Sequence, residues 1–313
     1  MNETQKKVLK APKKDLWKNI KRHFSVYSLL IIPLVYYTAL KYGPLVNGQI
    51  AFKDFSPIDG VWGSKWIGFA NFMSFFHSFY FGELLRNTIL YSLAKLVISV
   101  PLSVILAVAL YECTRNVLRR VVQTMVYLPH FLSWVIMYGI LLALLAPGDG
   151  MVNDIIDFCG GERVDFLTTT TTFPVIVVLS DAWKEMGWAA IIFIAALMGI
   201  DGTLFEAAMV EGASAVQRVW YITLPSIKSV IVTVVLLKLG TILDAGFNQM
   251  FMLYSVPVYS VADIIDTWVY RQGLLQFQFA LATAVGIFKG VIGFLLVRVS
   301  NTVVKKLADS SLI

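Results

Sequence analysis

The chain has 313 residues, of which 58% are hydrophobic and 15% charged, and its mean hydropathy is +0.72. This composition is too apolar for an ordinary soluble globular domain, and that class is excluded. The apolar residues fall into blocks of about 20, the length that crosses the hydrocarbon core of a bilayer. We therefore predict an all-α polytopic membrane protein.

The apolar blocks predict six transmembrane helices within one domain that covers residues 25–303. A basic arm, residues 1–24, precedes this domain, and a short tail, residues 304–313, follows it. Outside the blocks nothing is apolar enough to form a separate core, so we expect no additional soluble domain. The predicted spans are 25–42, 88–111, 121–146, 173–198, 227–252 and 280–300.

Basic residues are distributed unevenly between the connecting segments. Eight of the 26 lysines and arginines precede the first span, and others follow spans two and six or flank loop 199–225. Cytoplasmic loops carry an excess of lysine and arginine, so both termini and loop 199–225 are predicted to be cytoplasmic in a bacterial cell membrane. This topology accounts for the net charge of +6 without a nucleic-acid partner. The basic arm is expected to act as a retention signal or to contact lipid headgroups.

The sequence contains no motif for catalysis or for holding a cofactor. There is no GxxxxGK[ST] loop, so any ATP must be hydrolysed by another chain. His23, His77 and His130 lie in separate segments without the spacing of metal ligands. Cys113 and Cys159 fall on opposite sides of the predicted membrane and cannot pair. We therefore expect neither a metal nor a bound cofactor in this chain.

Several connections carry local signals of their own. Segment 45–83 is rich in aromatic residues, which favours lying along the outer membrane surface, although contact with an outside partner is the alternative. Pro129 predicts a kink in span three. The threonine run 168–172 is typical of a loop that ends in a helix cap.

Loop 199–225 is short and polar enough to lie in water, while the segments on either side must lie in lipid. Thr203 followed three residues later by Glu206 has the spacing of a capping box, which predicts a short helix. Gly212 suits the positive φ at which such a helix ends. A second helix is expected from about Ser214 to Tyr221, before the fifth span. These features fit either a coupling element or an amphipathic loop on the membrane surface.

The spacing within this loop resembles the coupling loop of the membrane subunits of type I ABC importers. In that pattern Glu-Ala-Ala is followed by three residues, Gly, nine residues and Ile-x-Leu-Pro. The matching positions are Glu206, Ala207, Ala208, Gly212, Ile222, Leu224 and Pro225. Stretches 51–57, 85–88, 127–134 and 265–271 are similar to the carbohydrate-uptake branch, in the group that handles complex oligosaccharides or polysaccharide fragments. The resemblance covers nearly the whole chain after the basic arm.

The resemblance implies the six-helix importer permease fold with a cytoplasmic coupling helix and no catalysis by this chain. It also implies a second homologous permease subunit, usually a different one, and two cytoplasmic ATPase subunits that bind ATP and Mg²⁺. An extracellular or periplasmic solute-binding protein would deliver the sugar. The helix from Glu206 to Gly212 would sit in a cleft of the ATPase, and ATP-driven closure would swing the permeases from inward-facing to outward-facing.

Polar residues inside spans usually face a bundle interior or a water-filled cavity, because facing lipid is costly. In span four, Lys184, Glu185 and Trp188 share one helical face with Asp181. In span five, Asp244 and Asn248 share a helical face with Thr241. This face lies at a depth in the membrane that overlaps the depth of the polar face of span four. We predict that the substrate pathway is lined by Lys184, Glu185, Trp188, Asp244 and Asn248.

The alternative for these groups is internal charge pairing that fixes helix packing, either Asp181 with Lys184 or Lys238 with Asp244. Two further span lysines, Lys95 and Lys289, lack neighbouring charges in the sequence. They are expected to contact another subunit or to snorkel to the interface.

Two other functions were compatible with parts of the sequence. An importer permease for amino acids, peptides or polyamines would have the same loop and a different cargo. A membrane-embedded enzyme could use the carboxyl groups of Asp181 and Glu185, which are one turn apart, but no nucleophile or metal set accompanies them. The sequence favours the carbohydrate permease over both.

Overall fold

The computed structural model describes residues 21–308, so most of the basic arm and the last five residues of the tail lie outside the described residues. Within the described part, the fold is helical apart from one antiparallel hairpin, in which Lys53 pairs with Trp66 and Asp54 with Lys65. The all-α class predicted from the composition is confirmed.

The elements follow one another with short connections. Those of the first half are α3 (Phe24–Tyr37), η1 (Thr38–Tyr42), α4 (Gly43–Leu45), η2 (Val46–Phe52), β1 (Lys53–Asp54), α5 (Gly60–Gly63), β2 (Lys65–Trp66), α6 (Ala70–Phe76), α7 (Phe81–Glu112), α8 (Asn116–Phe131), α9 (Trp134–Leu145) and α10 (Met151–Phe158). Those of the second half are α11 (Phe173–Leu197), α12 (Gly202–Val210), α13 (Ala215–Arg218), η3 (Val219–Thr223), α14 (Leu224–Gly240), η4 (Ile242–Asp244), α15 (Phe247–Leu253), η5 (Val256–Val258), α16 (Tyr259–Ala262), α17 (Ile265–Tyr270), η6 (Arg271–Leu275) and α18 (Phe279–Ala308).

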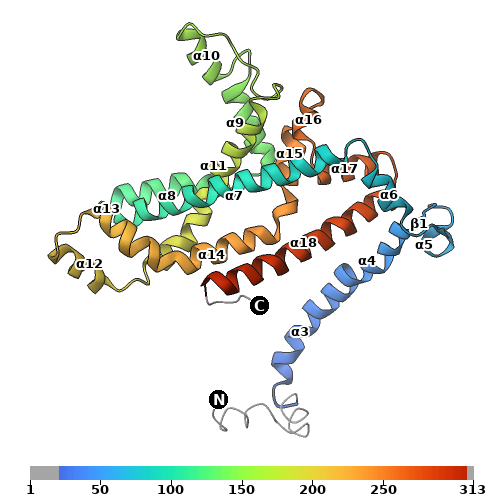
Figure 1. Cartoon of the computed structure of the whole chain (residues 1–313), viewed down its shortest axis with the longest axis horizontal. Helices are drawn as coiled ribbons and strands as arrows, with labels where there is room; N and C mark the ends of the chain where they lie inside the picture. Colours follow the sequence, from blue (N-terminus) through green and yellow to red (C-terminus); the bar gives the residue numbers. More distant parts are fainter. Residues whose placement is uncertain (1–20, 309–313) are drawn as a thin grey trace.

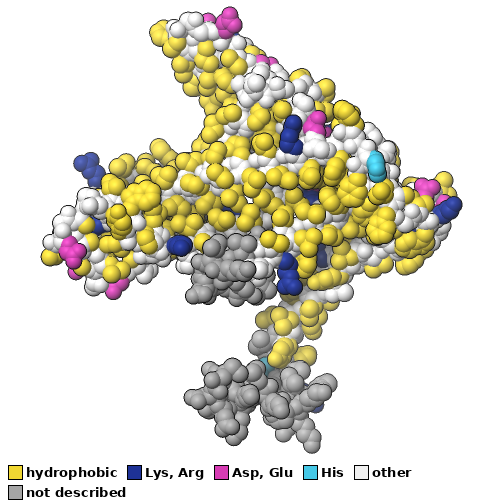
Figure 2. Space-filling view, in the orientation of Figure 1, with side chains coloured by type: hydrophobic (Ala, Val, Ile, Leu, Met, Phe, Trp, Pro, Cys, Tyr) yellow, Lys and Arg dark blue, Asp and Glu magenta, His cyan; other side chains and the backbone are white. Residues whose placement is uncertain are grey.

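Six helical segments correspond to the six predicted spans. Four of them are long and apolar enough to cross a membrane without a break: Tyr27–Phe52, Phe81–Glu112, Ala215–Gly240 and Phe279–Val299. The third span consists of α8 and α9, and the fourth is α11, whose 25 residues extend about 37 Å. In Figure 1, α7, α8, α14 and α18 cross the body of the molecule, and Figure 2 shows mainly hydrophobic side chains over that body.

The third span is not the single kinked helix that was predicted over 121–146. Helices α8 and α9 meet at 111°, with the break after Phe131 rather than at Pro129. The side chain of Ser133 caps the new helix by accepting a hydrogen bond from the Ile136 amide at 3.3 Å. Pro129 removes one backbone hydrogen-bond donor from α8, but the Ser133 cap fixes where α9 begins.

The fifth span is also broken, which corrects the continuous helix predicted over 227–252. Helix α14 ends at Gly240, a short 3₁₀ turn follows, and α15 begins only at Phe247. Between them Ala245 and Gly246 have φ values of 45° and 83°. Left-handed backbone at a non-glycine residue costs roughly 1–2 kcal/mol, so neighbouring groups must hold this break in place.

The aromatic segment 45–83 does more than lie along a surface. Phe75 of α6 is fully buried, with its ring centroid 5.4 Å from that of Trp268 and 5.9 Å from that of Phe288. Trp62 and Trp66 remain largely exposed on the hairpin side of the segment. Part of the segment thus packs into the core through Phe75, while its exposed tryptophans remain compatible with the surface position that the sequence predicts.

The threonine run 168–172 does not provide the predicted side-chain cap. Thr172 precedes α11, but its hydroxyl donates to the carbonyls of Phe166 and Thr169 instead of accepting from a helix amide.

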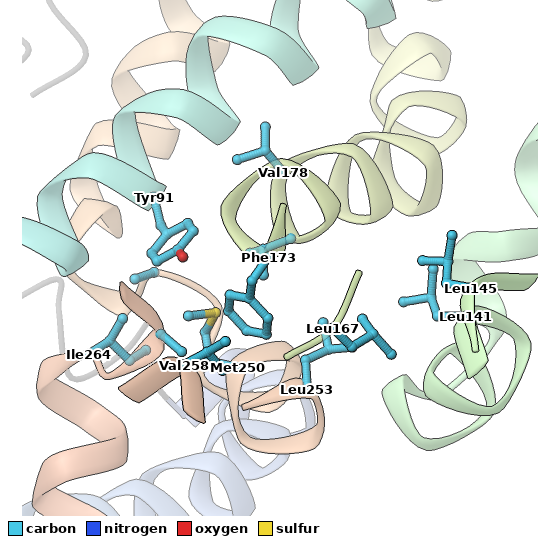
Figure 3. Packing of buried hydrophobic residues seen from close by; sticks show 13 residues of the cluster. Tyr91, Leu141, Leu145, Leu167, Phe173, Val178, Met250, Leu253, Val258 and Ile264 are labelled. Atoms are coloured by element: carbon cyan, nitrogen blue, oxygen red, sulfur yellow. The ribbon is translucent and has the colours of Figure 1, made fainter. Parts of the chain in front are cut away.

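The first span adds little to the core of this chain. Among the described residues from Phe24 to Tyr42 none is buried, and Figure 1 shows α3 pointing away from the other long helices. The largest core cluster instead lies between α7, α11 and α15. Figure 3 shows Tyr91, Phe173 and Met250 gathered there.

Close packing between α11 and α8 depends on Gly187. A methyl group at this position would overlap the backbone carbonyl of Val126. We expect Gly187→Ala to lower the melting temperature of the purified chain in a fixed detergent, because overpacking typically costs about 1–3 kcal/mol. Gly139→Ala on α9 is the matched control, since nothing lies within 4 Å of the added carbon. Equal melting temperatures for the two variants would contradict this packing.

Candidate functional site

The loop between spans four and five begins with a helix capped by Asp201. The Asp201 carboxylate accepts a hydrogen bond from the Thr203 amide at 3.0 Å, and this bond holds the pKa of the carboxyl below its usual value. The prediction that Thr203 is the cap, in a capping box with Glu206, is therefore wrong. An acidic side chain with extended backbone already precedes α12 and is favoured there by the helix dipole.

Helix α12 ends at the glycine that the sequence predicted. Gly212 has a φ of 79°, and the next amide, that of Ala213, donates to the Ala208 carbonyl at 2.9 Å. This closing pattern requires a left-handed residue at the turn. Gly212 is needed for its backbone and not for space, because nothing lies within 4 Å of the position of a Cβ.

The second helix of the loop starts where it was predicted but does not stop before the span. Ser214 and Gln217 form a reciprocal capping box, with bonds of 2.7 and 3.3 Å. From Ala215 the helix continues through η3 into α14 as far as Gly240. Leu224 and Pro225 therefore lie within one continuous helix that begins in the loop.

The loop presents a mixed surface at one end of the molecule. Glu206, Ala207, Gly212 and Pro225 are exposed, while Ala208 and Leu224 are half-buried. In Figure 1 α12 lies beyond the ends of the long helices, and Figure 2 shows acidic side chains there. Large apolar side chains are also exposed around it: Leu204, Met209, Val210, Val216, Trp220 and Tyr221.

The predicted pathway residues of span four lie against the end of α8. Lys184 is buried and donates to the carbonyls of Pro129 and His130 at 3.2 and 2.6 Å. The Glu185 carboxylate lies 3.0 Å from Nδ1 of the His130 ring, within hydrogen-bond and ion-pair distance. Trp188 stacks on the same ring, with centroids 4.5 Å apart and planes 2° apart. The three side chains thus hold the broken third span to α11, and Glu185 also lines a cavity.

Two cavities lie along the broken fifth span. The larger, of about 840 Å³, is lined by Trp134, Asp244, Gly246, Phe247, Asn248, Asp266, Val269, Tyr270, Gly273, Leu274, Phe279, Ala282 and Thr283. The smaller, of about 270 Å³, is lined by Ser92, Lys95, Leu96, Trp134, Asp181, Glu185, Lys238, Thr241, Ile242, Asp244, Ala245 and Gly246. Asp244 and Asn248, two of the proposed pathway residues, line the larger cavity. They do not align with Thr241 on one helix, because the helix is broken between them.

Lys95 corrects the expectation of a subunit contact or a snorkelling group. Its ammonium is buried, donates to the carbonyl of Ala245 at 2.9 Å and to the Gln249 side chain, and lies 3.4 Å from Asp181. Gln249 in turn donates to the carbonyl of Val177 at 2.7 Å. One lysine thereby joins α7, α11 and the break in span five.

Lys289 is likewise paired inside the chain rather than with lipid. Its ammonium lies 2.6 Å from Asp244 and 2.8 Å from Asp266, so α18 is joined to both the break and α17. The internal pairings predicted for this region, Asp181 with Lys184 and Lys238 with Asp244, are replaced by these partners. Sequence reasoning missed Lys95, Lys238, Asp266 and Lys289 as site residues; the one signal was that each is an ionisable residue near or inside a span.

Four helices long and apolar enough to cross a membrane, two bent helix pairs that would make six crossings, and an exposed helical loop after α11 are the features of an ABC importer's membrane subunit. The chain belongs to the family of binding-protein-dependent transport system inner membrane components, whose pattern matches residues 99–309. It is therefore a transport subunit, and ATP hydrolysis is carried out by separate subunits.

Similar proteins span nearly the whole chain. Protein LplB of Bacillus subtilis (strain 168) is 40% identical over 306 residues, which cover 97% of this chain and 96% of that protein. The polygalacturonan/rhamnogalacturonan transport system permease protein YteP of the same organism is 39% identical, covering 91% and 89%. A crystal structure of a bacterial ABC transporter that imports the acidic polysaccharide alginate contains a chain with a TM-score of 0.87 and 36% identity, covering 94% of this chain and 99% of that one.

The turn at Gly212 can be tested through its backbone. Gly212→Ala places a Cβ at positive φ, which costs about 1 kcal/mol, whereas Gly202→Ala puts the methyl group into open space. We expect faster amide hydrogen exchange in α12 for the first variant only. Unchanged amide hydrogen exchange in Gly212→Ala would contradict the requirement for glycine at this turn.

The role of Lys95 can be separated from that of its partner by a double mutant. Lys95→Met leaves the half-buried Asp181 without its cation, which we expect to cost about 3 kcal/mol, the lower end of the range for breaking a buried pair, and to lower the melting temperature. Lys95→Met with Asp181→Asn removes both charges and should recover part of this loss. If the double variant is as unstable as the sum of the two single variants, the pair is not coupled.

Proposed function

We propose that this chain forms one half of the translocation pathway of an ATP-driven importer for an oligosaccharide or a polysaccharide fragment. The observation that carries the proposal is the continuous helix from Ala215 to Gly240, which begins in the exposed loop and ends at the cavities. A movement of the loop, driven by a partner subunit, would be transmitted to the cavity walls along this helix. The family and the relatives support the same function.

The cavity chemistry supports a carbohydrate. Sugars present many hydroxyl groups and flat apolar ring faces, and they are bound by hydrogen-bonding groups beside aromatic planes. The larger cavity offers Asp244, Asn248 and Asp266 as acceptors beside the aromatic rings of Trp134 and Tyr270. A related structure was solved with an alginate pentasaccharide-bound periplasmic protein, and its matching chain is 35% identical. These relatives favour a saccharide over an amino acid, peptide or polyamine.

The proposed assembly has three further kinds of component. A second, homologous permease would complete the pathway, and two cytoplasmic ATPase subunits would bind ATP and Mg²⁺, each contacting the coupling loop of one permease. A solute-binding protein outside the membrane would deliver the saccharide. Both termini and the loop would be cytoplasmic, as the distribution of basic residues predicts. The exposed Leu204, Val210 and Trp220 give the loop apolar contacts that a protein surface would bury.

The coupling role is tested by reversing charge in the loop of the assembled transporter. Glu206→Arg places a cation where the ATPase would bind, and we expect uptake and substrate-stimulated ATP hydrolysis to fall at least roughly tenfold. Glu211→Arg is the matched control, because Glu211 is also exposed in the loop but lies outside the pattern shared with ABC importers. Normal uptake by the Glu206 variant would reject the coupling role.

The cargo is tested separately, with the cognate binding protein. A thermal-shift screen against neutral and acidic oligosaccharides and against amino acids and polyamines should show stabilisation by a saccharide only. Stabilisation by an amino acid or a polyamine would overturn the carbohydrate assignment and leave the importer class intact.

A further inference from the structure

The two cavities are separated by a wall made largely from the break in span five. Trp134, Asp244 and Gly246 line both cavities, so these three residues stand between them. The larger cavity extends toward the outer connection, through Tyr270 and Phe279. The wall has only a short 3₁₀ turn and two left-handed residues of its own, so side chains from other spans also hold it in position.

Lys95 and Lys289 both contact the wall, but Lys95 holds it more strongly than Lys289 does. Lys95 is buried and has its bonds to Ala245, Gln249 and Asp181, so the Ala245 side of the break is fixed. The pair of Lys289 with Asp244 is open to the cavity, since the Asp244 side chain is 60% exposed. A carboxylate that is this exposed can leave its partner at little cost in solvation.

Departure of Asp244 would not leave Lys289 without a partner. Lys289 also lies 2.8 Å from Asp266, whose side chain is 21% exposed. The penalty for an unpaired buried charge, which normally makes such pairs hard to break, is therefore avoided.

A second cation shares the smaller cavity with Asp244. Lys238 lines the smaller cavity together with Asp244, and among the residues that the structure describes it has no ion-pair partner within 4.0 Å. Asp244 thus pairs with one lysine that already has another carboxylate, and it shares a cavity with a second lysine that has none within 4.0 Å among the described residues. This is the arrangement of a side chain with two available positions.

We propose that Asp244 exchanges partners between Lys289 and Lys238 during the transport cycle, and that this exchange moves the wall between the two cavities. With Asp244 on Lys289 the smaller cavity is open, as in this structure. With Asp244 on Lys238 the carboxylate and the segment 241–244 fill the smaller cavity, while Ala245 keeps its bond to Lys95. Lys289 and Lys238 are positioning residues, and the inference rests on the proposed transport function.

The exchange is tested by thiol labelling of the assembled transporter in nanodiscs. Thr241→Cys is introduced with Cys113→Ser and Cys159→Ser, because Thr241 lines the smaller cavity. A small methanethiosulfonate reagent should label this cysteine rapidly at rest and roughly fivefold more slowly after ATP–vanadate trapping, when the cavity is filled. Lys289→Gln should give slow labelling at rest, whereas Lys238→Gln should give fast labelling in both states.

Two further variants distinguish loss of the exchange from a general loss of folding or assembly. Lys289→Arg retains the charge and should restore fast labelling at rest. Asp244→Asn removes the exchanging carboxylate, so Lys289→Gln should have no additional effect in that background. Asp244→Asn also reports on the same pair if Lys289→Gln does not assemble.

The proposal is overturned if Lys289→Gln and Lys238→Gln change labelling in the same direction, or if both label like the unmodified transporter at rest and after trapping. Uptake by the unmodified transporter is measured in parallel. Import that persists while the labelling pattern fails rejects the exchange alone, whereas no import of any saccharide rejects the proposed function.

Discussion

Backbone groups exposed by a break inside a membrane must find partners within the protein, because the bilayer core offers no water. This chain breaks two of its six spans and meets the requirement with lysines from neighbouring spans. Lys184 takes the carbonyls of Pro129 and His130 at the end of α8, and Lys95 takes the carbonyl of Ala245. The breaks, and the cavities beside them, exist because these lysines satisfy the backbone.

The lysines in turn require carboxylates, and α11 provides them. Asp181 lies 3.4 Å from Lys95, and Glu185 lies 3.8 Å from Lys184. A span with these charges would be costly in lipid, but here each is placed beside a broken neighbour. The same groups also give the smaller cavity its polar wall. Structural capping and the polar chemistry of the pathway are therefore properties of one network.

The loop and the network lie at opposite ends of one rigid element. The helix Ala215–Gly240 has 26 residues and a length of about 39 Å, with the capping box of Ser214 at its start. At the other end, the break after Gly240 lets the helix move without carrying α15 with it, because Gln249 and Lys95 tie α15 to α11 and α7. Displacement of the loop would thus be concentrated at residues 241–246, which form the wall between the cavities.

Some features of the candidate site could be predicted from the sequence and others could not. Asp244 and Asn248 were expected to line a pathway because polar groups inside a span need a polar surrounding, and both do line a cavity. Lys289 was expected at a lipid or subunit contact, because nothing near it in the sequence carries a carboxylate; its partner Asp266 is 23 residues away. The cap of α12 was misplaced by two residues, because Asp201 and Thr203 both suit that position.

The sequence by itself indicated the long apolar helices, the short helix of the polar loop after α11, and the turn at Gly212. Each of these depends on local physical chemistry: the length of an apolar run, the distribution of charge, and the backbone freedom of one residue. Only the tertiary structure decided where two spans break and which lysine meets which carboxylate. Those outcomes depend on groups far apart in the chain, such as Lys95 and Ala245, which are 150 residues apart and meet only when the helices pack.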